Sequence, residues 1–185
     1  DLWDRLDDKY LPVSFDMSSV VEGKEPCREP LCARSNIPNR PDVPIIGVVT
    51  RLTHQKGIHL IKHGIYKALE RGCQVVLLGS APDPSVQREF EDMANALKQN
   101  HFNDAALHLY FDEPLSHLIY AGSDMLLVPS MFEPCGLSQL IAMRYGAVPV
   151  VRRTGGLADT VHDYYHGHAK AEWEGMSPNG FQFDG

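Results

Sequence analysis

Residues 45–79 read IIGVVTRLTHQKGIHLIKHGIYKALERGCQVVLLG, and this stretch decides the fold. It holds two short apolar runs, 45–49 and 74–79, of the kind found in strands that are buried on both faces. Between the runs, apolar residues recur every three or four positions: Ile58, Ile61, Ile65 and Leu69. This spacing predicts an amphipathic helix, which Gly72 ends. A strand, a helix and a strand in this order predict two parallel strands joined by a right-handed crossover.

The same alternation continues along the chain. We expect further helices over residues 84–99, 114–121 and 136–145, a short helix from Leu157, and further strands over 106–111, 125–129 and 147–151. The fold class is therefore α/β, a Rossmann-like parallel sheet with helices on both faces, over residues 45–185. Residues 1–44 contain six prolines, so we expect an irregular lead-in segment without a long helix there.

The composition excludes several classes of protein. A hydrophobic fraction of 43% and a charged fraction of 22% are ordinary for a globular domain. The net charge of -7 argues against a nucleic acid or an anionic membrane as partner. No apolar run reaches the ~18 residues that span a bilayer, and no targeting peptide is visible. The four cysteines form no C-x-x-C pair, which favours free thiols in a reducing compartment.

Two cations follow the first predicted strand. In a parallel sheet, ligands bind beyond the carboxyl ends of the strands, so the loop that carries Arg51 and Lys56 lies on the binding edge. An arginine grips a diphosphate through two parallel donors, and a lysine acts as a mobile point charge. The ordinary alternative is that both are surface cations.

A second loop on the same edge reads Phe132-Glu133-Pro134-Cys135-Gly136-Leu137-Ser138 and precedes a predicted helix start. The amides of Gly136, Leu137 and Ser138 would face outward there as an anion site, and Glu133 could bind sugar hydroxyls. Two cations, free amides and one carboxylate together predict the transfer of a sugar from a nucleotide-sugar donor. The alternative for Glu133 is a solvated loop carboxylate.

Other residues near this edge leave two interpretations open. Phe111, predicted to end the third strand, either packs in the core or stacks on a nucleotide base. The glycines of the loop 153–157 mark a turn, or they allow a ligand or a facing domain to come near. The histidines do not have the spacing of a metal site, and we expect no metal. We expect a solvated loop for His162, His166 and His168.

Five blocks together resemble the starch synthases and bacterial glycogen synthases. They are Arg51-Leu52-Thr53-His54-Gln55-Lys56-Gly57, Leu78-Gly79-Ser80, Ser116-His117, Pro129-Ser130-Met131-Phe132-Glu133-Pro134-Cys135-Gly136-Leu137 and Arg153-Thr154-Gly155-Gly156-Leu157. The resemblance covers nearly the whole chain, and the block from Glu133 to Leu137 is its most specific part. Residues 57–63 and 20–24 are most similar to the plant and green-algal type III soluble starch synthases.

The resemblance implies the two-domain GT-B glycosyltransferase fold, with this chain as most of the C-terminal, donor-binding half. The family transfers glucose from ADP-glucose to the 4-hydroxyl at the non-reducing end of an α-1,4-glucan, with retention and without a metal or cofactor. ADP is the product. The resemblance also implies a plastid stroma location and a missing N-terminal acceptor domain. We therefore expect a piece of a longer protein, truncated at both ends, with little or no activity alone.

By position, the resemblance assigns a role to each candidate. Arg51 and Lys56 match the diphosphate-binding pair, and Glu133 matches the residue that holds the donor glucose, which makes these three the catalytic candidates. Phe111 matches the aromatic ring stacked on adenine. The remaining donor contacts are Cys135 and the backbone of Gly136, Leu137 and Ser138, which matches the distal-phosphate contact.

Three positions depart from the family pattern. Ser138 stands where bacterial relatives often have threonine, Ile141 stands where many retaining GT-B enzymes have a second glutamate, and Pro26 and Pro30 fall where relatives have a short helix. Two other functions stay open beside the starch synthase: a non-catalytic module that binds ADP or glucan, and a GT-B relative that uses a UDP-sugar.

Overall fold

The computed structural model describes residues 2–166, 175 and 177–184 of the 185-residue chain. The helices are α1 (Val20–Ser35), α2 (Ile58–Glu70), α3 (Pro84–Asn100), α4 (Glu113–Gly122), α5 (Ser138–Arg144) and α6 (Gly155–Thr160), with one 3-10 turn, η1 (His54–Lys56). The strands are β1 (Ile45–Val49), β2 (Gln74–Leu78), β3 (Ala105–His108), β4 (Met125–Val128), β5 (Val148–Arg152) and β6 (Phe181–Phe183).

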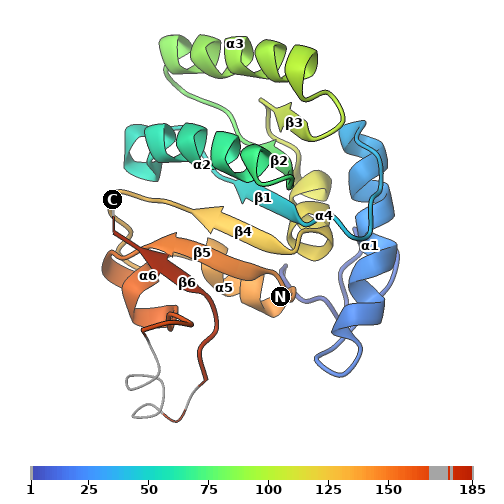
Figure 1. Ribbon diagram of the computed structural model, residues 1–185. Coiled ribbons are helices and arrows are strands. Elements are labelled where there is room, and N and C mark those ends of the chain that lie inside the picture. Colours follow the sequence, from blue (N-terminus) through green and yellow to red (C-terminus); the bar gives the residue numbers. More distant parts are fainter. Residues whose placement is uncertain (1, 167–174, 176, 185) are drawn as a thin grey trace.

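These strands form one parallel sheet in the order β3-β2-β1-β4-β5-β6 (Figure 1). The predicted α/β fold with a parallel sheet is confirmed. The order runs one way from β1 to β3 and the other way from β4 to β6, so it reverses between β1 and β4. In sheets of this kind, the crevice beyond the carboxyl ends at the reversal is where ligands bind.

Helices cover both faces of the sheet, because side chains alternate between the faces along each strand. In β2, Val75 and Leu77 belong to the core cluster that contains residues of α2 and α3, whereas Val76 and Leu78 belong to the cluster that contains residues of α1, α4 and α5. Figure 1 shows α2 in front of the sheet and α4 and α5 behind it. All five residues of β2 are buried, which is why its sequence is an unbroken apolar run after Gln74.

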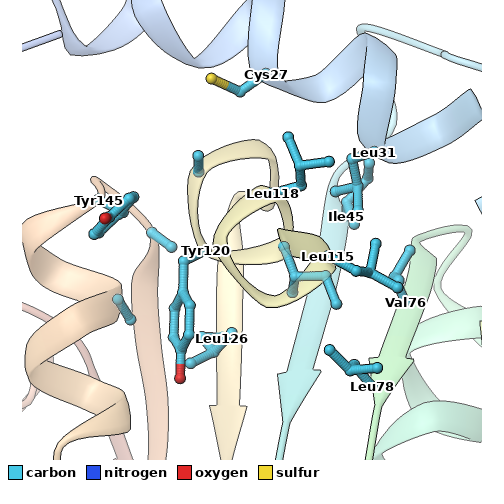
Figure 2. Packing of buried hydrophobic residues seen from close by; sticks show 14 of the residues in the cluster. Cys27, Leu31, Ile45, Val76, Leu78, Leu115, Leu118, Tyr120, Leu126 and Tyr145 are labelled. Carbon is cyan, nitrogen blue, oxygen red and sulfur yellow. The ribbon is translucent and has the colours of Figure 1, made fainter. Parts of the chain in front are cut away.

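The expectation of an irregular segment over residues 1–44 is wrong. Helix α1 spans 16 residues and contains both Pro26 and Pro30. An interior proline costs a helix about 3 kcal/mol, but α1 buries Cys27, Leu31 and Cys32 almost completely, and a fully buried leucine alone contributes about 1.5–3 kcal/mol. Figure 2 shows Cys27 and Leu31 facing α4, which lies between α1 and the strands. The segment therefore belongs to the same core as the sheet.

Two boundaries differ from the sequence-based expectation at positions that matter for the site. β3 ends at His108, so Phe111 lies in the following loop rather than at the strand end. α5 begins at Ser138 rather than Gly136, because Gly136 has a left-handed φ of 72° that a helix cannot contain. The edge strand β6 was not predicted, since three residues are too short to show a period.

All four cysteines, Cys27, Cys32, Cys73 and Cys135, are free thiols. Among the described residues, none of the helices combines the length and the apolar character that crossing a membrane requires.

Candidate functional site

The loops after β1 and β4 are joined where the strand order reverses. Gly57 follows the β1 loop with a left-handed φ of 71°, and a Cβ there would lie 2.1 Å from the carbonyl oxygen of Pro129. The backbone N–H of Met131 donates to the carbonyl of Gln55 at 2.8 Å. Only glycine allows such an approach of two backbones. The loop that carries Arg51 and Lys56 is therefore fixed against the loop that carries Glu133.

The loop after β5 joins the same edge. The backbone N–H of Gly156 donates to the carbonyl of Glu133 at 2.8 Å. A Cβ on Gly156 would lie 2.1 Å from the carbonyl oxygen of Cys135, and one on Gly155 would lie 2.3 Å from that of Glu133. These two glycines are thus required by the close approach of the neighbouring loop. Three loops from three strands meet around the backbone of Glu133.

Lys56 and Glu133 form an ion pair across this junction, although they are 77 residues apart in sequence. Their side chains are 20% and 11% exposed. The hydroxyl of Ser130 donates to the same carboxylate oxygen, Oε2, at 3.0 Å. Two of the three catalytic candidates from the sequence are therefore in direct contact. Each of the two was identified from sequence, but neither their contact nor the part of Ser130 was predicted.

Arg51 and Phe111 line a separate pocket on the same edge. The cavity measures about 260 Å³ and lies over the ends of β1 and β2, with Gly79, Tyr110 and Tyr120 also in its wall. The Phe111 side chain is 86% exposed, so it does not pack in the core. Arg51 forms no ion pair with any residue that the structure describes. The pocket thus combines an open aromatic face with a cation whose charge is not neutralised.

Tyr120 is a buried residue in the wall of this pocket. It lines the cavity from α4 and is 2% exposed. Burial raises the pKa of Tyr120 to about 12. The phenol therefore keeps its proton at neutral pH. Tyr120 was missed from sequence because it reads as one more apolar residue of an amphipathic helix.

The residues Cys135, Gly136 and Leu137 form a turn whose carbonyls are occupied and whose amides are open. The buried side chain of Gln139 donates to the carbonyls of Cys135 and Gly136, at 3.2 and 3.0 Å. Within the described part of the chain, the N–H groups of Gly136 and Leu137 make no hydrogen bond. Such amides can bind an anion. The expected open amides are thus present, but at Gly136 and Leu137 they belong to a turn and not to a helix.

The sequence-predicted residues therefore fall into three neighbouring groups on one edge. Lys56 pairs with Glu133, Arg51 shares a pocket with Phe111, and Cys135 to Ser138 form the turn that follows Glu133 in the loop after β4. The first and second groups share the loop after β1, and the first and third share the loop after β4. The arrangement offers an aromatic face, an unpaired guanidinium, open amides and a carboxylate.

No cluster of three or more histidine, cysteine, aspartate or glutamate side chains with the geometry of a metal site occurs among residues 2–166, 175 and 177–184. His162 is buried, so its expected place in a solvated loop is wrong, whereas His166 is exposed. His168 lies outside the described residues.

The family that matches this chain and two individual proteins similar to it are glycosyl transferases or glucan synthases. The family described as "Glycosyl transferases group 1" matches residues 33–172. "Starch synthase 3, chloroplastic/amyloplastic" of Arabidopsis thaliana is 58% identical over 185 residues, which is 100% of this chain and 18% of the relative. "Glycogen synthase" of Protochlamydia amoebophila (strain UWE25) is 52% identical over 143 residues, 76% of this chain and 27% of the relative.

A solved structure shares the fold in detail. The catalytic domain of starch synthase IV from Arabidopsis thaliana, bound to ADP and acarbose, is 42% identical with a TM-score of 0.89. The match covers 100% of this chain and 36% of that one. The chain spans less than a fifth of the plant starch synthase 3 proteins that it matches, at 18% and 15% of their lengths.

Proposed function

The chain belongs to the group 1 glycosyl transferases, and from this premise we propose that it is the donor-binding part of a starch synthase. The reaction proposed is the transfer of glucose from ADP-glucose to the non-reducing end of an α-1,4-glucan, with retention of configuration. The observation that carries the proposal is the meeting of Lys56 and Glu133 where the strand order reverses. A cation and a carboxylate at that point suit a ligand that has both phosphates and sugar hydroxyls.

The pocket of Arg51 and Phe111 is assigned to the nucleoside. Its volume of about 260 Å³ suits a purine base with part of its ribose, and the exposed ring of Phe111 offers a stacking surface. Stacking of a base on an aromatic ring contributes about 1–3 kcal/mol. The related starch synthase IV domain was solved with ADP bound, which supports a nucleoside diphosphate here.

The diphosphate is assigned to Arg51 and Lys56 and to the open amides of Gly136 and Leu137. In the transfer, the bond between the anomeric carbon and the diphosphate oxygen breaks, and negative charge builds on the departing ADP. The glucan 4-hydroxyl forms the new bond to the anomeric carbon, and its proton passes to the departing diphosphate oxygen. Donors aimed at the diphosphate stabilise this transition state more than the ground state. Since the protein supplies these charges itself, the proposal assigns no metal and no cofactor.

Glu133 is assigned to the hydroxyls of the donor glucose, next to the diphosphate site. The acceptor glucan needs a facing surface that the described residues do not supply alone. We therefore propose that an N-terminal acceptor domain completes the cleft in the longer protein and that the isolated chain transfers glucose slowly or not at all. The chloroplastic and amyloplastic names of the relatives support a plastid stroma location.

Calorimetry on the chain tests the proposal with ADP, ADP-glucose, UDP and UDP-glucose as ligands. We expect ADP and ADP-glucose to bind at least about tenfold more tightly than their UDP counterparts, because a purine covers more of the Phe111 ring. Tighter binding of the UDP ligands would favour a UDP-sugar enzyme instead. Binding of maltoheptaose without any nucleotide binding would favour the glucan-binding module. Binding of none of these ligands would overturn the donor site.

A further inference from the structure

Two donors converge on one oxygen of the Glu133 carboxylate and leave the other oxygen open. Ser130 and Lys56 both contact Oε2, from the loop after β4 and the loop after β1. Within the described residues, Oε1 of Glu133 receives no hydrogen bond. The carboxylate is thus held from one side only.

Ser130 is placed for this contact by burial. Its side chain is 1% exposed, at the point where β4 passes into the loop. The bond to Glu133 is the one hydrogen bond that the structure gives to its hydroxyl, and it spans three residues within one loop. The backbone of Glu133 is fixed as well, because its carbonyl accepts from the N–H of Gly156 at 2.8 Å.

The terminal torsion of a glutamate side chain is broad and roughly two-fold, so a free carboxylate samples many orientations. Two donors on the same oxygen remove that freedom. A buried hydroxyl on a short side chain is a stricter restraint than a flexible ammonium on a long stem. Ser130 therefore contributes the geometry and Lys56 contributes the charge.

We propose that Ser130 is a positioning residue: together with Lys56 it holds Oε2 of Glu133, so that Oε1 is presented to a hydroxyl of the donor sugar. The inference rests on the proposed function, because it assumes a sugar at this site. It also gives Lys56 a part that the family resemblance does not imply, namely to hold the carboxylate of Glu133. Ser130 touches Glu133, and Glu133 touches the sugar.

The test is a ratio of two affinities measured on the chain by calorimetry. ADP lacks the sugar and ADP-glucose has it. The dissociation constant of ADP divided by that of ADP-glucose therefore isolates the contribution of the glucose, and we call this quotient the ratio. For Ser130→Ala we expect the dissociation constant of ADP to stay within twofold of its value for the unmodified chain. We expect the ratio to fall about tenfold. Ser130→Cys, which keeps the size and weakens the donor, should shift the ratio in the same direction.

Two further variants control the experiment. Ser123 is also fully buried, two residues before β4 at the amino ends of the strands, and its hydroxyl has no hydrogen-bond partner in the described structure. Ser123→Ala should leave the ratio unchanged. Glu133→Gln should lower the ratio at least as much as Ser130→Ala, and the two changes together should lower it no further, because Ser130 acts through Glu133.

The outcomes separate the inference from the proposed function. If the unmodified chain binds both ligands and Ser130→Ala keeps the ratio within twofold, the positioning role is wrong and the donor site stands. Equal weakening of ADP and ADP-glucose would also overturn it, because that result describes a purely structural serine. If the unmodified chain binds neither ligand, the donor site falls, and the inference falls with it.

Discussion

Gly57 and Pro129 approach so closely that a Cβ on Gly57 would lie 2.1 Å from the carbonyl oxygen of Pro129. This contact joins the two strands at the centre of the sheet, β1 and β4, beyond their carboxyl ends. It places the 3-10 turn that ends in Lys56 beside the segment that leads to Glu133. The geometry of the candidate site therefore depends on a residue without a side chain.

Gly57→Ala should destabilise the chain and disturb the site together. The substitution adds the strain of a left-handed φ, about 1–2 kcal/mol, to a backbone clash that needs the loops to separate. We expect a loss of about 3 kcal/mol or more in the free energy of unfolding, measured with urea. Gly72→Ala is the matched control, since Gly72 has a φ of 77° and nothing lies within 4 Å of its Cβ position. Equal losses in the two variants would contradict the close-contact argument.

Phe111→Ala should weaken nucleotide binding without changing stability. The ring is 86% exposed, so its removal leaves no cavity, but a base would lose its stacking surface. We expect the dissociation constant for ADP to rise about tenfold, in line with the loss of about 1–3 kcal/mol of stacking. Phe102→Ala provides the control, because Phe102 is 63% exposed and lies outside the Arg51 pocket. Calorimetry and a thermal melt of each variant measure the two effects.

The sequence was sufficient for the elements with a strong period. The apolar run of β1 and the spacing of α2 define their positions to within one residue. The two prolines of α1 misled the prediction, because local propensity counts against a helix whose stability comes from burial against α4. The short strand β6 carries too few residues to give a signal.

For the site, the sequence identified the residues but not their partners. Lys56 and Glu133 are 77 residues apart, and they meet because the sheet places β1 beside β4. Strand order is a property of the whole fold, so no local pattern encodes this ion pair. Ser130 gave no signal for the same reason, since its part depends on the orientation of a carboxylate in the folded loop.

Lys56→Ala and Glu133→Ala should each lower turnover by orders of magnitude in a longer protein that contains both halves of the cleft. Each change removes one partner and leaves the other charge partly buried and unpaired, in addition to the loss of its contact with the donor. Glucan elongation from ADP-glucose measures the effect. Lys62→Ala is the matched control, because Lys62 also forms an ion pair, with Glu89, but lies away from the site. Near-normal turnover of both site variants would refute the assignment of Lys56 and Glu133.

Helix α1, which was not predicted from sequence, should make the stability of the chain depend on pH. Burial of Cys27 against α4 raises the pKa of its thiol from 9.0 to about 11. Between these values the unfolded chain loses the proton and the folded chain keeps it. The contribution of Cys27 to stability is therefore fully present below pH 9 and is lost as the pH rises toward 11. Urea unfolding of the unmodified chain and of Cys27→Ala, at intervals from about pH 7 to 11, isolates this contribution.

Cys27→Ala removes the titrating group, so its stability should fall less steeply above pH 9, although its stability at neutral pH is lower because of the cavity. The residual slope comes from other buried groups, since burial also raises the pKa of Cys32 and of Tyr120 and lowers the pKa of Lys24 to about 8, which acts in the opposite direction. The thiol of Cys73 is less buried and offers a comparison, because Cys73→Ala should change the slope less than Cys27→Ala. If the slopes of Cys27→Ala and the unmodified chain coincide, the Cys27 thiol is not held in the α1–α4 contact that makes α1 part of the core.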